Sequence, residues 1–392
     1  MRRALLLTLA FLLVFASEIF RVYFIMPFPG SQQANTIEFA YFLNNHIWWI
    51  RLLLLIVIFS LGWHYLKKGR WWQKTIFVFF TLLYALIFYA FNFKFLADKM
   101  FYQPKEKTFA TAATDSTNKD KLIVGVSIGN ESKAYPIEII GYHHQVRDTI
   151  GSQPVMVTYC TVCRTGRVYS PFVDGKIEEF RLVGMDHFNA MFEDKTTKSW
   201  WQQATGLAIA GPLKGKQLPE ILSRQMRLGE WLTLHPTSAI FQPDKNFKRQ
   251  YDSLEGYDEG TIQGSLERRD TASWQFKSWV VGVNRDGESK AYDWNMLTQK
   301  RFIADQVGKT RILITVEPDN KTFYAFAVND SLHFDFDPST NMLVDNHAKV
   351  RCRLNGQCTS ESTKEIALTP IQAYQEFWHS WRSFHPNTSR YQ

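Results

Sequence analysis

The sequence predicts an N-terminal three-helix transmembrane region followed by a duplicated, mostly β (β-rich α+β) extracytoplasmic domain. Three observations predict this fold class: long apolar stretches within residues 1–96, short β-type runs after residue 121, and an internal repeat. The clearest helical candidates in the β-rich part are the stretch before Trp231 and Pro370–Trp381. With 392 residues the chain has room for two or three domains, and four cysteines are too few for a disulfide-rich secreted scaffold.

The three apolar stretches are each long enough to cross a bilayer, and they run roughly over residues 4–26, 47–66 and 75–93. Residues 1–96 hold nine lysines and arginines against two acidic residues, so they carry +7 of the total charge of +8. The remaining residues are electrically balanced and give no sign of the basic surface that nucleic-acid binding needs. The expected partner of residues 1–96 is therefore the lipid bilayer.

The distribution of basic residues predicts how the chain is oriented. Lysine and arginine gather at Arg2, Arg3 and the loop 67–74, whereas the loop 27–46 has none. Because basic loops stay in the cytoplasm, we expect a cytoplasmic N-terminus and everything after Phe93 on the outer side. This predicts an integral protein of the bacterial inner membrane with a periplasmic or otherwise extracytoplasmic C-terminal domain.

Two features of the first apolar stretch allow more than one interpretation. It could be a cleaved signal peptide, but apolar character continues to Met26, which favours an uncleaved anchor. Glu18 and Arg21 lie three residues apart within it, and we interpret them as a charged pair near the end of the span that faces another helix.

The internal repeat is the most informative feature of the outer region. Ile123–Tyr135 and Val280–Tyr292 match at eight of thirteen positions, and the offset of 157 continues without a gap into the residues that follow. We predict two copies of one β-rich module, over residues 97–258 and 259–392. Two copies are typical of packed pseudo-symmetric halves, since a solenoid needs more repeats.

The repeat also separates residues that the fold needs from residues that are free to carry chemistry. Four titratable or soft residues of copy one are replaced in copy two: His143, His144, Cys160 and Cys163 by Lys300, Arg301, Glu317 and Asn320. Their joint loss predicts a single site that is present in copy one only. A tryptophan and a histidine four residues later survive in both copies, which predicts a structural role for that histidine.

Cys160 and Cys163 stand in a strand–turn–strand pattern, which is typical of a metal knuckle and not of the redox CxxC that opens a helix. Zinc or copper would need one or two further ligands, for which His143, His144 and His187 are candidates. Copper is slightly preferred because thiolate and imidazole ligands outside the cytoplasm suit Cu(I). The leading hypothesis is therefore a membrane-anchored protein that binds a transition metal.

Two other function classes stay open. In the first, Cys160 and Cys163 cycle between dithiol and disulfide as a thiol–disulfide oxidoreductase. In the second, the domain is a non-catalytic module that binds a ligand or partner through a Trp-rich surface, and the cysteines are an inert clip. Trp200 and Trp201 are candidates for lining a ligand groove, although buried aromatics at a strand end are commoner.

The sequence also contains a second pair of cysteines, and it lacks several common catalytic motifs. Cys352 and Cys358 bracket five residues in copy two, which predicts a disulfide that closes the loop. The sequence contains no GxSxG, HExxH or Walker motif, so it does not decide whether the protein is an enzyme.

The sequence resembles the DUF3179 family of uncharacterised bacterial and archaeal proteins. The resemblance rests on Ala134–His143, Val146–Gly151 and Val157–Cys163, and it covers most of copy one and, more weakly, copy two. Family members usually carry proline after the first cysteine and glycine after the second, as in a rubredoxin-like knuckle. The resemblance implies no activity.

The chain departs from the family pattern at three positions. Thr161 and Arg164 stand in place of the proline and the glycine, and an arginine where glycine relaxes the turn disfavours a tight tetrahedral metal geometry. The residue after His143 is usually acidic in the family, whereas His144 would add a nitrogen ligand here.

Overall fold

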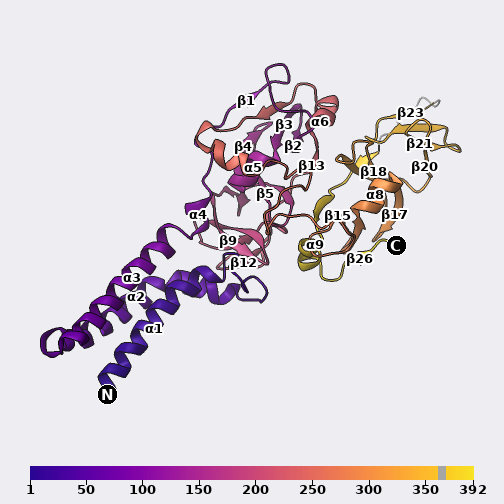
Figure 1. The fold of residues 1–392 in the computed structure, drawn as a ribbon. Coiled ribbons are helices and arrows are strands. Elements are labelled where there is room, and N and C mark those ends of the chain that lie inside the picture. Colours follow the sequence, from indigo (N-terminus) through magenta and orange to yellow (C-terminus); the bar gives the residue numbers. More distant parts are fainter. Residues whose placement is uncertain (361–367) are drawn as a thin grey trace. The chain divides into compact units, whose positions relative to one another are not determined.

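The computed structural model describes residues 1–360 and 368–392, and these fold into two compact units (Figure 1). Unit 1 comprises residues 1–102, 178–202 and 207–217, and unit 2 comprises residues 103–177, 203–206 and 218–392. Residues 178–202 of the first predicted module therefore belong to unit 1. Three apolar N-terminal helices followed by a β-rich region confirm the expected fold class.

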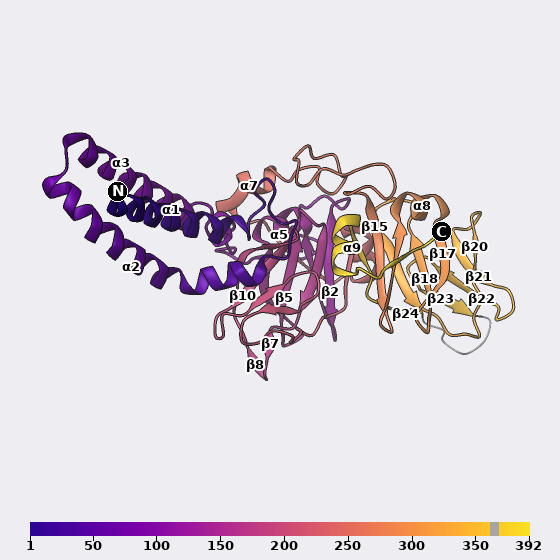
Figure 2. The ribbon, with the colours of Figure 1, turned by 90° about the horizontal axis from the view of Figure 1, so that it is seen from below.

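Unit 1 begins with three helices that are long and apolar enough to cross a membrane. They are α1 (Arg2–Tyr23), α2 (Ile37–Lys68) and α3 (Trp71–Phe93). Figures 1 and 2 show the three helices running side by side, and most of their large apolar side chains, such as Leu53 and Leu82, are exposed. An apolar outer surface of this kind is typical of helices that face lipid.

A buried polar cluster links the three helices. Arg51 of α2 donates from Nε and Nη2 to the two carboxylate oxygens of Glu18 of α1, at 2.6 and 2.7 Å. Asn92 of α3 accepts hydrogen bonds from both Arg51 and Arg21, each at 2.7 Å. Glu18 therefore pairs with the second helix and not with Arg21, because the guanidinium fork of Arg51 satisfies both of its oxygens at once.

The rest of unit 1 is a short helix and a four-stranded antiparallel sheet with the order β12-β11-β10-β9. These elements are α4 (Ala97–Met100), β9 (Phe180–Asp186), β10 (Asn189–Asp194), β11 (Trp200–Gln202) and β12 (Ala208–Ala210). Trp200 and Trp201 are buried, and their indole N–H groups donate to Glu193 at 3.0 Å and to Asp194 at 2.9 Å. They are packing residues and do not form an exposed groove.

Unit 2 contains the rest of the first copy. Its strands form a five-stranded sheet with the order β1-β14-β3-β2-β13, a three-stranded sheet β4-β5-β6 and a β7-β8 hairpin. The strands are β1 (Phe109–Ala110), β2 (Leu122–Ile128), β3 (Glu131–Pro136), β4 (Gln145–Ile150), β5 (Gln153–Cys160), β6 (Thr165–Tyr169), β7 (Phe172–Val173), β8 (Lys176–Ile177), β13 (Ser223–Arg227) and β14 (Ala239–Phe241). The helices are α5 (Ile137–His143), α6 (Leu228–Leu234), the 3₁₀ turn η1 (Lys245–Phe247) and α7 (Lys248–Asp252).

The second copy supplies three four-stranded sheets, with the orders β25-β15-β16-β26, β17-β18-β19-β24 and β20-β21-β22-β23. The strands are β15 (Trp279–Arg285), β16 (Glu288–Asp293), β17 (Phe302–Val307), β18 (Thr310–Val316), β19 (Phe323–Ala327), β20 (Asp335–Asp337), β21 (Met342–Asp345), β22 (Val350–Arg353), β23 (Cys358–Ser360), β24 (Thr369–Pro370), β25 (Tyr374–Phe377) and β26 (Ser389–Arg390). The helices are α8 (Trp294–Lys300) and α9 (Trp378–Phe384).

The repeated sequence builds the same local structure twice. Val124 pairs with Tyr135 across β2 and β3, and Val281 pairs with Tyr292 across β15 and β16. In each copy the tyrosine hydroxyl donates to the aspartate of the next strand, Tyr135 to Asp148 at 2.6 Å and Tyr292 to Asp305 at 2.7 Å. The residues shared by both copies therefore support the fold.

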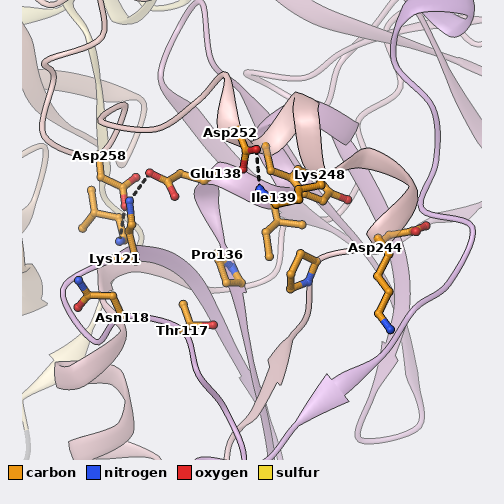
Figure 3. A pocket seen from close by; sticks show the side chains of 14 residues that line it. Thr117, Asn118, Lys121, Pro136, Glu138, Ile139, Asp244, Lys248, Asp252 and Asp258 are labelled. Carbon is orange, nitrogen blue, oxygen red and sulfur yellow. Dashed lines mark hydrogen bonds and ion pairs between the residues drawn. The ribbon is translucent and has the colours of Figure 1, made fainter.

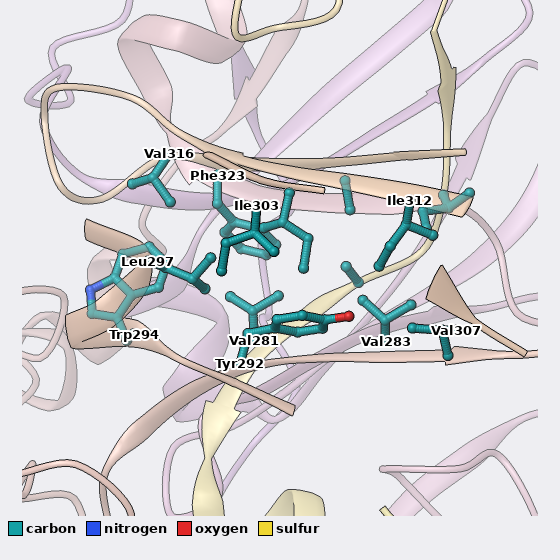
Figure 4. Close-up of a cluster of buried hydrophobic side chains, with 14 of the residues drawn as sticks. Val281, Val283, Tyr292, Trp294, Leu297, Ile303, Val307, Ile312, Val316 and Phe323 are labelled. Atoms are coloured by element: carbon teal, nitrogen blue, oxygen red, sulfur yellow. The ribbon is translucent and has the colours of Figure 1, made fainter. Parts of the chain in front are cut away.

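Clusters of buried apolar side chains stabilise unit 2. One lies within the second copy, where β15–β19 and α8 bury side chains that include Val281, Tyr292 and Phe323 (Figure 4). Another joins the copies, since Met226 and Trp231 of the first pack with Leu343 of the second. Burial of apolar area in this shared cluster stabilises the contact between the copies.

The expected helix over Pro370–Trp381 is wrong over most of its length. The chain pairs as β25 with β15, with Phe377 opposite Trp279, and α9 begins only at Trp378. A free edge of β15 competes for this segment, and pairing with it overrides the local helical pattern.

Candidate functional site

The Cys-x-x-Cys turn joins β5 to β6 and is fully buried. Cys160, the last residue of β5, pairs with Thr165, the first residue of β6, so residues 161–164 make the turn. Both Cys160 and Cys163 are 0% exposed, and both are thiols. The hairpin brings the two side chains to one place, as the sequence predicts for this spacing.

Residues of the second copy enclose the turn. The Phe377 N–H donates to the carbonyl oxygen of Cys163 at 3.0 Å, and Lys277 Nζ donates to the carbonyl oxygen of Val162 at 2.7 Å. His379 Nε2 lies 3.3 Å from the same Val162 oxygen, and its ring stacks on Phe276. The site is thus composite, with thiols from copy one and polar groups from copy two.

The electrostatics of the site favour the protonated thiol of Cys163. Burial raises the pKa of Cys163 well above its usual range, and the contact with the Cys160 sulfur raises it further. Lys277 and a hydrogen bond with Ser380 act in the opposite direction. Lys277 is itself buried, and this burial lowers the pKa of its ammonium. A cation therefore lies beside two thiols in a place with little access to water.

Arg164 completes the turn in the left-handed conformation that glycine adopts most easily, with φ of 57°. A non-glycine residue there costs about 1–2 kcal/mol. Its guanidinium is buried, donates to Gln375 Oε1 at 3.1 Å and to the Tyr257 carbonyl at 3.3 Å, and lies 3.8 Å from the Trp279 ring centroid. These contacts offset the backbone strain, so the turn keeps its shape without glycine.

A buried ionic chain extends from the pair. Ser380 Oγ donates to Glu376 Oε2 at 3.0 Å, and Glu376 forms a salt bridge with Arg167 of β6. Both Glu376 and Arg167 are about 1% exposed, so each needs the other to remain charged in the interior. The chain fixes Ser380 and holds α9 against the first copy.

The three candidate histidines make other contacts. His143 Nε2 lies 2.6 Å from the Tyr251 hydroxyl, and His144 Nδ1 lies 3.1 Å from the Tyr142 carbonyl. His144 is buried, which lowers its pKa to about 4. His187 belongs to unit 1, where Asp186 lies 2.7 Å from its Nδ1 and raises its pKa.

The structure places Cys160 and Cys163 in contact with each other. Within residues 1–360 and 368–392, His, Cys, Asp and Glu side chains form no group of three or more arranged to hold a metal ion. Cys352 and Cys358, on β22 and β23, are joined by a disulfide.

Lys277, His379 and Ser380 were missed by the sequence analysis, although the repeat contains a signal for them. Aligning the shared tryptophan–histidine motifs places His379 and Ser380 opposite Gly229 and Glu230 of the first copy, and the offset of 157 places Lys277 opposite Asp120. The signal is that copy two alone carries these three residues, just as copy one alone carries Cys160 and Cys163.

A family model described as "Protein of unknown function (DUF3179)" matches residues 103–388. The chain belongs to the DUF3179 family. The DUF3179 match includes the Cys-x-x-Cys turn as well as Lys277, His379 and Ser380, so the whole composite site lies within it. No curated protein and no solved structure matches the chain. The family carries no assigned activity, so function must be argued from the site itself.

Proposed function

We propose that the protein binds one Cu(I) ion through the thiolates of Cys160 and Cys163. The observation that supports this is the contact between two buried thiols beside the buried ammonium of Lys277. Thiolates are the soft ligands that select Cu(I), and Cu(I) is stable with only two of them. A histidine or a third cysteine is then not required.

The charge of the site favours copper over zinc. Two thiolates and one Cu(I) leave a net charge of −1, which the ammonium of Lys277 neutralises. Leaving a buried charge without a partner is costly, so this compensation supports a stable complex. Zinc takes four ligands in structural sites, and in the described ranges no group of three or more candidate ligands accompanies the cysteines.

Burial favours a metal ion over reaction with another protein. A thiol that attacks a partner's disulfide must be accessible and partly ionised, whereas Cys163 is 0% exposed and its pKa is raised. A metal ion displaces the thiol protons when it binds, and it can enter while the chain folds. The site is therefore suited to retaining an ion.

Metal analysis of the full chain tests this proposal. The protein is purified in detergent without chelators after expression with added copper, and its metal content is measured by mass spectrometry. We expect about one copper per chain in the wild type and almost none in C160S/C163S. C352S/C358S is the matched control, since it loses two cysteines outside the site, and it should retain copper. Equal copper in wild type and C160S/C163S, or none in the wild type, would refute the proposal.

Thiol–disulfide oxidoreduction by the same two cysteines is a second candidate. It is favoured by the contact between the two sulfurs, which makes an internal disulfide geometrically simple. In this reaction the pair gives two electrons and two protons to a substrate disulfide, and a Cys160–Cys163 bond forms. A pair with a reduction potential above about −300 mV, in a chain free of copper, would favour this function.

We also propose that the site faces the extracytoplasmic side of a bacterial inner membrane. The basic residues at Arg2, Arg3 and the loop 67–74 support a cytoplasmic N-terminus. With α1, α2 and α3 each crossing once, residues after Phe93 then lie outside. Delivery or storage of copper beyond the cytoplasm fits a membrane-anchored Cu(I) site.

A further inference from the structure

Unit 2 contains a second candidate site, a cavity of about 450 Å³ whose lining shares no residue with the Cys-x-x-Cys turn. It lies between the start of β2, α5 and the segment around α7 (Figure 3). A volume of this size is within the range of about 300–1,000 Å³ that is usual for small-molecule sites. The residues that line this cavity determine which class of small molecule it would bind.

Asp258 is a buried carboxylate with an unused acceptor in this lining. It is 2% exposed, and its Oδ2 accepts a hydrogen bond from the Leu122 N–H at 2.7 Å. Its Oδ1 is buried without a hydrogen-bond partner among the residues that the structure describes. An unsatisfied buried acceptor is costly, and a bound donor would remove that cost.

The cations near Asp258 form hydrogen bonds with groups other than its carboxylate. Glu138 lies beside it in Figure 3 and is paired with Lys121 at 2.5 Å. Arg164 reaches the Asp258 backbone carbonyl at 3.4 Å and not the side chain. The nearby cations thus bond to other groups, and burial together with the Glu138 charge opposes ionisation of Asp258.

The walls of the cavity are mostly apolar, and they set a second condition for a ligand. Pro136 and Ile139 line the cavity between the Asp258 end and the Asp244 end in Figure 3, and both are buried or nearly so. Tyr251 also contributes to the lining. A ligand for this cavity therefore needs an apolar body and one strong hydrogen-bond donor.

We propose that this cavity binds a small primary amine, whose ammonium group donates to Asp258 Oδ1 while its apolar body packs against Pro136 and Ile139. An anion would meet the carboxylates of Asp258 and Glu138 at this end and be repelled. A neutral alcohol would satisfy the hydrogen bond but leave the carboxylate uncompensated. The site is separate from the thiol pair, so it does not depend on copper.

Binding of benzylamine, with benzyl alcohol as its neutral counterpart, tests this inference on the full chain in detergent. Affinity is measured by titration calorimetry at pH 7.5. We expect benzylamine to bind at least about tenfold more tightly than benzyl alcohol, since a hydrogen bond to a charged group is the stronger one. Equal affinity for the two compounds, or no binding of benzylamine, would overturn the proposal.

Three variants locate the binding. Asp258→Asn keeps an oxygen for the Leu122 N–H but places an N–H₂ donor where the ligand donates, so benzylamine should bind at least about tenfold more weakly. Asp252→Asn removes a carboxylate that is paired with Lys248 at 2.7 Å, and it should change affinity little. Lys121→Met frees Glu138 from its cation and should strengthen binding severalfold.

The variants also keep the inference testable if one of them misfolds. Unchanged affinity in Asp258→Asn, or weaker affinity in Lys121→Met, would contradict the assigned orientation. C160S/C163S should bind benzylamine like the wild type. If C160S/C163S loses copper but still binds benzylamine, the two sites are independent. If Asp258→Asn loses benzylamine binding but keeps copper, the same conclusion follows.

Discussion

Asp258 shows how a single buried carboxylate can reduce the stability of a fold. Burial, reinforced by Glu138, raises its pKa from 3.8 to about 6. A carboxyl group with a raised pKa favours folding while it is protonated, and this contribution is lost as pH rises from about 4 through 6. At pH 7 the loss is on the order of 3 kcal/mol.

Asp258→Asn should therefore gain stability relative to the wild type as pH rises. At pH 4 both side chains are neutral and their melting temperatures should differ little, whereas at pH 7 only the wild type carries the buried charge. We expect the difference to grow by several degrees between these pH values, at about 2–4 °C per kcal/mol. Thermal unfolding of the full chain in detergent measures this. Parallel pH profiles of the two proteins would contradict it.

A second prediction concerns Lys277 and rests on the proposed Cu(I) site. Its ammonium lies among buried groups beside Cys163, so Lys277→Met removes the positive charge while keeping much of the volume. Without this charge the copper–thiolate complex is a buried anion, and Cu(I) affinity should fall by at least about tenfold. Competition with a colorimetric Cu(I) chelator measures the effect.

Lys248→Met is the control for that experiment, because Lys248 is an exposed lysine of the same unit. It should bind Cu(I) like the wild type. Equal affinity in Lys277→Met and wild type would show that Lys277 does not compensate the charge of the bound ion.

At the scale of elements, α6 and α9 perform the same packing task in the two copies. Each places a tryptophan ring on a glycine of the neighbouring strand, Trp231 on Gly125 and Trp381 on Gly282. The histidine four residues later lies against that ring, with centroids 4.1 Å apart for Trp231 and His235 and 3.9 Å apart for Trp381 and His385. The sequence predicted a structural role for this histidine because both copies keep it.

The glycines under these rings should not accept a methyl group. A Cβ at Gly125 would lie 2.5 Å from the Trp231 ring, and one at Gly282 would lie 2.2 Å from the Trp381 ring. Gly125→Ala and Gly282→Ala should each destabilise the protein by about 1–3 kcal/mol, the usual effect of overpacking. Melting temperatures test this, with Ser127→Ala at the exposed end of β2 as control. An unchanged melting temperature in both glycine variants would refute this packing argument.

The same elements show which parts of the fold can be predicted from sequence. The β-type run Leu122–Ser127 lies within β2, because a short run of apolar, mostly β-branched residues next to turn residues is a local signal. α5 and α8 were missed because each has only seven residues, too few for a helical period to stand out. Tertiary contacts stabilise such short helices, and a local pattern does not contain those contacts.

The candidate site likewise contains some residues that the sequence predicts and others that it does not. Cys160 and Cys163 were predicted because their spacing is local and because copy two lacks them. Lys277 and His379 reach the turn from more than a hundred residues away, and only the packing of the two copies brings them there. The spacing of residues in the sequence therefore predicted the two cysteines of the site but not the charged Lys277 beside them.

In the whole molecule, the Cys352–Cys358 pair and the basic loops both bear on which side of the membrane unit 2 occupies. Cys352 and Cys358 are joined by a disulfide that closes a short loop of β22 and β23. Disulfides persist mainly in oxidising compartments, so this bond favours an extracytoplasmic position for unit 2. The distribution of lysine and arginine around α1–α3 favours the same side.

Cysteine labelling in intact bacterial cells tests the orientation of the full chain. Its own cysteines should react little, because Cys160 and Cys163 are buried and the other pair is a disulfide. Ser116→Cys adds an exposed thiol after the third span, and Lys68→Cys adds one at the end of α2. A membrane-impermeant maleimide should label Ser116→Cys in intact cells and Lys68→Cys only after permeabilisation. The opposite pattern would place Cys160 and Cys163 in the cytoplasm, where thiols stay reduced, and would contradict the proposed extracytoplasmic copper handling.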